Sequence, residues 1–307
     1  MLKRIFLLAA CLCAALPCTT GAQSLEVAAV TVALEGPTVN ADGTVYFTDL
    51  NGDRILKMAT DGTVTTFRGP ANRPNGMVFD AQFRLIVCER GDLARNTPSR
   101  LTRTDMTSGR IDVLADNYQG RRFVELNDVT VDGAGRIYFT DNPGKAVYRV
   151  DPDGKLTQIL SAPAIDNANG LTIAPNDKTF YLIEANTGAN GPRRITAFDL
   201  SADGTPSNPR VFHNFYPGRS GDGMTIDSEG NLWVAAGLNN LRNNTETLDT
   251  KAGIHEFAPD GRLLQHIPVP IDLLTNVAFG GPGLNTLYIT AGGTLYKVAT
   301  KTAGTRR

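Results

Sequence analysis

A short pattern of one polar residue followed by an apolar run recurs six times along the chain. In each copy, a carboxylate or amide residue stands before apolar residues that alternate with polar ones, as in residues 222–227. The copies lie roughly 40–50 residues apart, which is a spacing expected of a repeated structural unit. Alternation with a period of two is typical of half-buried β-strands. The six polar residues are Glu35, Asn75, Asn127, Asn169, Asp222 and Asn276.

Each copy continues with further short strands separated by turn residues. Residues 45–49 and 54–58 follow the first copy as two more strands, and Asp61-Gly62 then marks a turn. Asp-Gly favours a tight hairpin because glycine adopts a positive φ without a Cβ clash. No long stretch of the chain has helical periodicity, so the pattern predicts an all-β protein with about four strands per copy.

Six such copies predict a six-bladed β-propeller, with four-stranded antiparallel blades around a central channel. A single blade cannot bury both faces of its sheet, so neighbouring blades must stack and close into a ring. The innermost strand of each blade begins near the channel, and we expect the six polar residues to converge there. We expect a strand from the other terminus to complete blade 1, with Glu26–Ala33 and Leu295–Ala299 as candidates. The alternative is a β-sandwich or β-helix in which these polar residues only stabilise turns.

Composition narrows the range of partners. The 307 residues include 30 basic and 31 acidic side chains, which gives a formal charge of −1. This balance offers no basis for binding nucleic acid or an anionic membrane surface. The sequence leaves the oligomeric state open.

The N-terminus has the pattern of a secretory signal peptide. Lys3 and Arg4 precede an apolar stretch over residues 5–16, and small residues 20–22 follow it. The apolar stretch is too short for an ordinary membrane-spanning helix. We expect cleavage after residue 22, a single domain over 23–307, and a secreted or periplasmic protein. Lipidation at Cys18 is a weaker alternative, because Pro17 stands where a small residue is expected.

Few residues of the mature chain suit nucleophilic or zinc chemistry. Cys88 is the one cysteine beyond the signal segment, and its apolar strand predicts a buried structural thiol. The three histidines, His213, His255 and His266, lack the spacing of a zinc site. His255 and His266 are expected to pack on outer strands, whereas His213 precedes the Asp222 loop and is a candidate to reach the channel mouth. The sequence also lacks a Gly-x-Ser-x-Gly elbow and a phosphate-binding glycine loop.

The six recurring residues offer carboxylate and amide oxygens. Hard cations prefer such ligands, so a ring of them predicts one divalent cation, with Ca2+ first and Mg2+, Mn2+ or Zn2+ as alternatives. Asn-Gly and Asp-Gly are also ordinary turn dipeptides, so some of the six could serve turns alone. Asn276, which is not followed by glycine, is the first residue to which we assign a turn role.

Taken together, the motifs resemble the SMP-30/gluconolactonase family from Glu35 to Val298. The resemblance implies a six-bladed propeller with one divalent cation in its channel, and hydrolysis of sugar lactones. It further implies that Glu35, Asn169 and Asp222 ligate the cation and that Asn127 contacts the substrate or reaches the metal. The motifs that carry it are Glu35-Gly36-Pro37, Arg73-Pro74-Asn75-Gly76, Leu85-Ile86-Val87-Cys88-Glu89, Asn127-Asp128, Asn169-Gly170-Leu171, Asp222-Gly223-Met224, Gly230–Val234 and Asn276–Gly281.

The chain departs from the family pattern at one substrate position. Lactonases of this family carry a sugar-binding arginine two residues before the counterpart of Asn127, where this chain has Glu125. Arg121 and Arg122 lie nearby, and we predict that Arg122 takes over this contact. An extended loop from Gly237 to Gly253, containing Arg242 and Glu246, is expected to form one wall of the pocket.

These expectations combine into metal-dependent hydrolysis of a gluconolactone-like aldonolactone. Asp222 is the predicted base for the attacking water, and Asn75 and Asn127 are predicted to bind substrate hydroxyls. Two alternatives remain open. One is a broader esterase or organophosphate hydrolase on the same calcium propeller. The other is a non-catalytic ligand-binding propeller, or a strictosidine synthase-like relative, with a structural cation.

Overall fold

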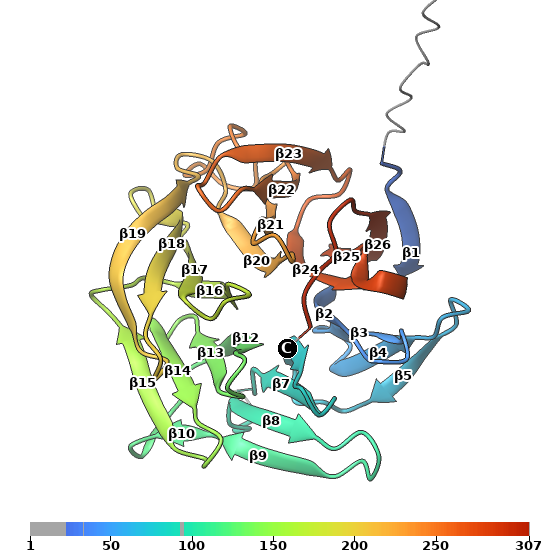
Figure 1. Cartoon of the computed structure of the whole chain (residues 1–307), viewed down its shortest axis with the longest axis vertical. Coiled ribbons are helices and arrows are strands. Elements are labelled where there is room, and N and C mark those ends of the chain that lie inside the picture. Colours follow the sequence, from blue (N-terminus) through green and yellow to red (C-terminus); the bar gives the residue numbers. More distant parts are fainter. Residues whose placement is uncertain (1–22, 33, 93–94, 307) are drawn as a thin grey trace, which may run out of the picture.

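Six sheets surround a central channel in the computed structural model, which describes residues 23–32, 34–92 and 95–306. Each sheet has four antiparallel strands, and the sheets follow one another around the ring in chain order (Figure 1). The predicted six-bladed propeller is thus confirmed. The predicted signal segment, 1–22, lies outside the described residues. Within the described ranges, no helix is long and apolar enough to cross a membrane.

The innermost strand of each blade comes first in its chain segment, except that β1 precedes all six blades. The first three blades are β2 (Leu34–Val39), β3 (Val45–Asp49), β4 (Arg54–Met58), β5 (Val64–Arg68); β6 (Pro74–Phe79), β7 (Leu85–Glu89), β8 (Arg100–Thr104), β9 (Ile111–Ala115); and β12 (Leu126–Val131), β13 (Ile137–Asp141), β14 (Ala146–Val150), β15 (Leu156–Ser161). The last three are β16 (Ala168–Ile173), β17 (Thr179–Ala185), β18 (Arg193–Leu200), β19 (Pro206–Asn214); β20 (Gly221–Ile226), β21 (Leu232–Ala236), β22 (Gly253–Phe257), β23 (Leu263–Pro268); and β24 (Leu274–Gly280), β25 (Thr286–Ala291), β26 (Thr294–Ala299), with β1 (Glu26–Val30) outermost. A short hairpin, β10 (Asn117–Tyr118) with β11 (Arg121–Arg122), and a 3-10 turn, Pro282–Leu284, complete the described elements.

The ring closes through the sixth blade rather than the first. β1 pairs antiparallel with β26, so the two predicted closing segments meet each other there, and blade 1 is complete without them. The expectation for blade 1 was therefore wrong about which sheet gains the extra strand. The physical requirement is unchanged, because β1 covers the edge that β26 would otherwise leave unpaired.

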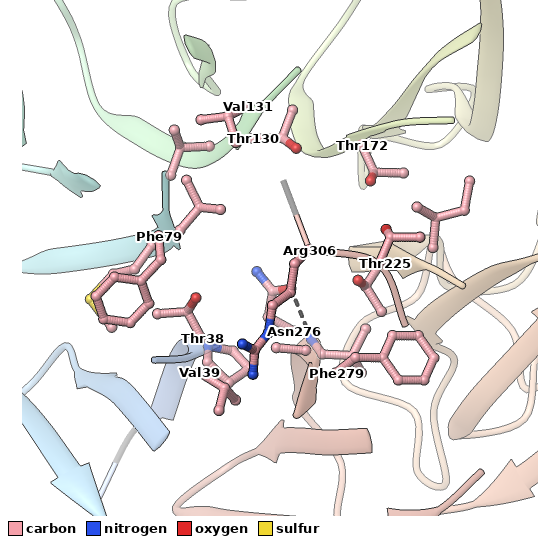
Figure 2. Close-up of a pocket in the computed structure, with 18 of the residues that line it drawn as sticks. Thr38, Val39, Phe79, Thr130, Val131, Thr172, Thr225, Asn276, Phe279 and Arg306 are labelled. Atoms are coloured by element: carbon pink, nitrogen blue, oxygen red, sulfur yellow. Dashed lines mark hydrogen bonds between the residues drawn. The ribbon is translucent and has the colours of Figure 1, made fainter. Parts of the chain in front are cut away.

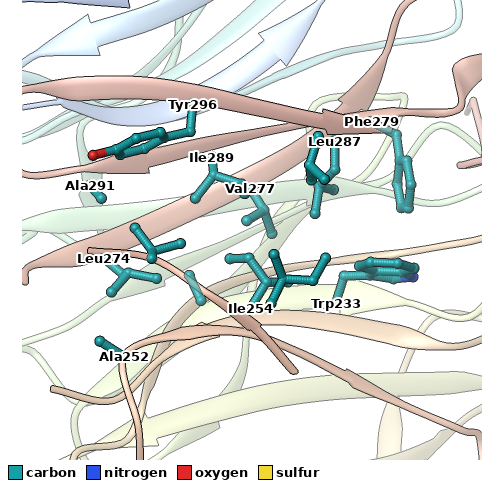
Figure 3. Packing of buried hydrophobic residues seen from close by; sticks show 14 residues of the cluster. Trp233, Ala252, Ile254, Leu274, Val277, Phe279, Leu287, Ile289, Ala291 and Tyr296 are labelled. Atoms are coloured by element: carbon teal, nitrogen blue, oxygen red, sulfur yellow. The ribbon is translucent and has the colours of Figure 1, made fainter. Parts of the chain in front are cut away.

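The apolar core lies between neighbouring blades. Between blades 5 and 6, Trp233 and Ile254 pack against Val277 and Phe279, as Figure 3 shows. The Trp233 and Phe279 rings meet edge to face at 5.7 Å. Burying one large apolar side chain stabilises the fold by roughly 1.5–3 kcal/mol, so stacked blades hold one another in place.

In blades 2, 3 and 5, an aspartate sets the turn that brings the second strand back along the innermost one. In blade 3, Asp132 accepts hydrogen bonds from the N–H groups of Ala134 and Arg136, both at 3.0 Å, and from Arg136 Nε at 2.6 Å. Asp80 and Asp227 bind backbone N–H groups at the same relative positions. These local bonds fix the turn, and the turn fixes the register of the inner strand pair.

Candidate functional site

The second residues of five innermost strands line the same end of the channel. In these five blades the second residue is a recurring polar residue of the sequence pattern, and in the sixth it is Thr275. Asn276 is therefore one position further along its strand than the other five. The six second residues are Glu35, Asn75, Asn127, Asn169, Asp222 and Thr275.

Side chains at the third position of these strands separate the two ends of the channel. The residue there is glycine in four blades, whereas the other two blades carry Asp128 and Asn276. Asn276 Nδ2 donates a hydrogen bond to Asp128 Oδ2 at 3.2 Å, so the two side chains join across the channel. A Cβ on Gly76 would lie 2.3 Å from Asp128 Oδ1, and one on Gly223 would lie 2.2 Å from Asn276 Oδ1. The glycines thus leave room for this pair, which we call the channel floor.

Above the channel floor lies a cleft of about 340 Å3. It is lined by five of the predicted site residues, namely Glu35, Asn75, Asn127, Asn169 and Asp222. Asn276 lines the cavity on the other side of the floor instead. The expected convergence therefore holds for five of the six recurring residues.

Two of the three predicted cation ligands are already in contact. Asn169 Nδ2 donates to Asp222 Oδ1 at 2.7 Å, and Arg219 Nη2 donates to Asp222 Oδ2, also at 2.7 Å. Glu35 is 7% exposed and lines the same cleft. Among the described residues, no three His, Cys, Asp or Glu side chains come within reach of one metal. A cation site here thus needs the amide oxygen of Asn169 in addition to two carboxylates, a donor set suited to hard cations.

Burial dominates the ionisation of the carboxyl groups near the channel floor. It raises the pKa of Glu35 well above its usual range, and the nearby Asp222 and Asp128 raise it further. Burial also raises the pKa of Asp222, although Arg219 and Asn169 oppose this change. The pKa of Asp128 rises to about 7, mainly through burial. A cation between Glu35 and Asp222 would favour their charged forms.

Arginines line the cleft beyond those that the sequence pattern suggested. Arg90, Arg193 and Arg219 are the three that we did not predict, and the sequence held a signal for Arg90 and Arg219. Arg90 directly follows β7, which runs antiparallel to β6 and so ends beside Asn75. Arg219 precedes Asp222 by three residues and also donates to the carbonyl oxygen of Leu274 at 3.0 Å.

Glu125 forms an ion pair with Arg90 inside the cleft. A guanidinium thus reaches the Glu125 position from blade 2. The structure does not bring Arg122 into this cleft. Arg122 lies exposed on the β10–β11 hairpin, and its Nη1 donates to Asn96 Oδ1 at 2.9 Å.

The long loop between β21 and β22 supplies one wall of the cleft, as its length and polar residues suggested. Arg242 and Glu246 both line the cleft. Arg242 Nε and Nη2 donate to the two oxygens of Glu246, at 2.9 and 3.2 Å. Asn243 Nδ2 adds a third bond to Glu246 at 2.8 Å, so the carboxylate holds the loop together.

The thiol and imidazole groups lie away from the cleft lining. Cys88 is fully buried, as predicted, and its Sγ donates to the carbonyl oxygen of Asp128 at 3.5 Å. Burial raises the pKa of this thiol well above its usual range. His213 packs against the rings of Phe215 and Phe257, with centroids 4.6 and 4.4 Å apart. It takes no part in lining the cleft.

The opposite end of the channel has different chemistry. The fifth residue of each innermost strand faces it, and these residues are Thr38, Val78, Thr130, Thr172, Thr225 and Ala278. The cavity there is smaller, at about 150 Å3. Arg306, from the C-terminal segment, lies in the middle of this opening, as Figure 2 shows.

The fold and the cleft together define a six-bladed propeller whose inner strands present carboxylate and amide groups at one end of the channel, where arginines from other segments join them. The chain belongs to the family described as "SMP-30/Gluconolactonase/LRE-like region", which matches residues 34–293. The resemblance drawn from the motifs is confirmed.

Named relatives agree with this family. The chain is 29% identical to a gluconolactonase of Zymomonas mobilis, over 88% of this chain and 79% of that protein. It is 31% identical to the pentonolactonase XacC of Haloferax volcanii, over 60% of each chain. A solved gluconolactonase from Xanthomonas campestris is 31% identical and aligns with a TM-score of 0.76, over 91% of this chain and 90% of its own. A calcium-binding regucalcin from Agrobacterium tumefaciens, 18% identical, shares the fold with a TM-score of 0.73.

Proposed function

We propose that this protein is a metal-dependent lactonase that hydrolyses a gluconolactone-like aldonolactone to the corresponding acid. The observation that carries the proposal is the contact between Asn169 and Asp222 in the cleft that Glu35 also lines. Similarity to proteins named gluconolactonase and pentonolactonase supports the substrate class.

Glu35, Asn169 and Asp222 would hold one divalent cation through oxygen. Ca2+ fits this set best, because hard cations prefer carboxylate and amide oxygens and the described site contains no imidazole or thiolate; Mg2+, Mn2+ and Zn2+ are the alternatives. When bound, such a cation supplies a Lewis acid for the lactone carbonyl oxygen.

The side chains of the cleft perform the remaining steps. Asp222 accepts the proton of the water that attacks the carbonyl carbon, and Arg219 holds the carboxylate in position. The ring C–O bond breaks, and the leaving ring oxygen takes up a proton, which gives the hydroxy acid. Asn75 and Asn127 line the cleft and are suited to donate amide hydrogens to substrate hydroxyls.

The test is a reconstitution assay. Metal-free protein is loaded in turn with Ca2+, Mg2+, Mn2+ and Zn2+, and each sample is assayed with aldonolactones and aryl esters. We expect turnover of an aldonolactone only after a cation is added. If aryl or phosphate esters are turned over and aldonolactones are not, the broader esterase alternative replaces this proposal. If no substrate is turned over, the non-catalytic propeller alternative replaces this proposal.

We also propose that the protein is exported and that its mature chain begins near Gln23. This proposal rests on the basic and apolar pattern of residues 1–22. N-terminal sequencing of protein from the native host tests this, and an intact Met1 in soluble cytosolic protein would refute it.

A further inference from the structure

Four arginines line the candidate cleft, more than an uncharged sugar requires. They are Arg90, Arg193, Arg219 and Arg242, and the same cleft contains the carboxylates of Glu35, Glu125, Asp222 and Glu246. Neutral amide and hydroxyl groups are sufficient to bind sugar hydroxyls. The arrangement of the charges therefore needs a separate explanation.

The four carboxylates are not paired one to one with the four arginines. Glu125 pairs with Arg90, and Glu246 pairs with Arg242. Arg193, which is 1% exposed, instead donates to the carbonyl oxygens of Pro217 and Gly188, at 2.7 and 2.8 Å. Carbonyl oxygens satisfy its N–H groups but carry no formal charge, so the positive charge of Arg193 remains beside the cleft.

Arg219 forms its ion pair with Asp222, which is also a proposed cation ligand. Its Nη2 donates to Asp222, and its Nη1 has no hydrogen-bond partner among the described residues, although its side chain is only 6% exposed. A cation held by Asp222 and Glu35 takes up the negative charge of both carboxylates. Neither Arg193 nor Arg219 then has a carboxylate of its own among the residues that line the cleft, so the loaded cleft has an excess of positive charge.

We infer that the cleft selects a lactone that carries an anionic substituent, such as a carboxylate, away from its carbonyl group. Arg242 is the residue assigned to contact this substituent. Its side chain is 36% exposed, so a ligand can reach it, and Glu246 holds the guanidinium in one orientation through two hydrogen bonds. Guanidinium N–H groups pair well with carboxylate, sulfonate or phosphate oxygens. This inference rests on the proposed lactonase function and specifies its substrate.

The experiment compares two lactones that differ in a single group. D-glucaro-1,4-lactone carries a carboxylate where D-glucono-1,4-lactone carries a hydroxymethyl group. With the cation-loaded wild-type protein at low ionic strength, we expect kcat/KM to be at least about tenfold higher for the glucaro compound. Raising the salt concentration from about 0.01 to 0.5 M should reduce this preference, because salt screens the attraction.

Variants then identify the residue that causes the preference. Arg242→Gln should remove most of the ratio between the two lactones, whereas Arg242→Lys, which keeps the charge, should retain most of it. Arg262→Gln alters an exposed arginine of the same blade outside the cleft and should leave the ratio unchanged. The salt dependence of the wild type stands as a test even if Arg242→Gln disturbs the loop.

The outcomes separate this inference from the proposed function. Equal or better turnover of the glucono compound overturns the anionic-substrate inference and leaves the lactonase proposal intact. A preference for the glucaro compound that Arg242→Gln does not change overturns the role of Arg242. If the loaded protein hydrolyses neither compound nor any other lactone, the proposed function fails, and the inference fails with it.

Discussion

The two ends of the central channel are built from the same six strands and differ in almost every chemical respect. Where the strands begin, their second residues offer three amides, two carboxylates and one hydroxyl, and arginines surround them. Three residues further along, the same strands offer four threonines, one valine and one alanine. Threonine hydroxyls carry no charge, so at this end the fifth residues offer none of the carboxylates that a hard cation prefers. Asp80 and the floor residues Asp128 and Asn276 are the carboxylate and amide groups that line the cavity here.

The channel floor keeps the two ends apart. Asp128 and Asn276 meet across the channel, and Gly76 and Gly223, at the third position of two other strands, leave space for them. On the far side, Thr302 Oγ1 donates to Asp227 Oδ2 at 2.6 Å, and Gly304 N donates to Leu284 O at 2.8 Å. These bonds hold the C-terminal segment over the threonine end. We therefore propose that the reaction takes place at the charged end, whereas the C-terminal segment covers the threonine end.

The largest expected effect comes from Asp222→Ala, which removes a ligand charge and the proposed base together. We expect at least about a 1000-fold loss of kcat. Thr225→Ala, on the same strand at the threonine end, is the matched control and should keep kcat within about twofold. A steady-state lactone assay on both variants is the measurement. If Asp222→Ala kept chelator-resistant activity, the metal mechanism would be wrong.

A smaller effect is expected from Asn169→Ala, which removes a neutral ligand and leaves both carboxylates. Cation affinity should fall roughly 10- to 100-fold, and excess cation should partly restore activity. Thr172→Ala changes the other end of the same strand and should leave affinity unaltered. Calorimetric titration of metal-free protein measures the affinities, and equal losses in both variants would contradict the contrast between the two ends.

The two channel ends also show how much of the fold and of the site could be predicted from the sequence alone. The ring of blades followed from spacing and alternation, and five site residues followed because each begins an apolar strand. Asn276 was wrongly grouped with the other five residues. Thr275 is the true second residue of its strand, and it has no carboxylate or amide that would continue the pattern. The Arg90–Glu125 pair joins blades 2 and 3, so it depended on tertiary contacts that no local pattern contains.

The channel floor is expected to contribute more to stability than to turnover. Asn276→Ala leaves the buried Asp128 carboxyl without its side-chain donor, which should lower the free energy of unfolding by about 1–3 kcal/mol. We expect kcat to fall less than about tenfold. Urea unfolding and the lactone assay measure the two quantities. A loss of turnover as large as that of Asp222→Ala would mean that the floor takes part in the chemistry.

The chain's histidines provide a pH-dependent effect far from both ends. His255 stacks near Phe257 and lies 4.7 Å from the ring of His266, and its Nε2 lies 3.0 Å from the carbonyl oxygen of Lys251. Burial, together with the nearby His266 and His213, lowers its pKa from 6.5 to about 4, and the contact with the Lys251 carbonyl opposes this change. Between pH 6.5 and 4, the unfolded chain therefore binds a proton here that the folded chain does not.

The contribution of His255 to the free energy of unfolding should accordingly be complete above pH 6.5 and fall as the pH decreases through this window, by about 2 kcal/mol at pH 5, whereas the raised pKa of Asp128 acts in the opposite direction. His255→Gln, which cannot titrate, should flatten this dependence. Urea unfolding at pH 7.5 and pH 5 measures it for the wild type and the variant. Identical pH dependence in the two proteins would show that His255 is not the group responsible.

The location of a bound cation tests the contrast between the two channel ends most directly. Crystals grown with Mn2+ would reveal the ion through its anomalous scattering. We predict a peak within ligating distance of oxygens from Glu35, Asn169 and Asp222, on the cleft side of the channel floor, and none among the threonines. A peak on the threonine side, or full lactonase activity in crystals without a peak, would contradict this account.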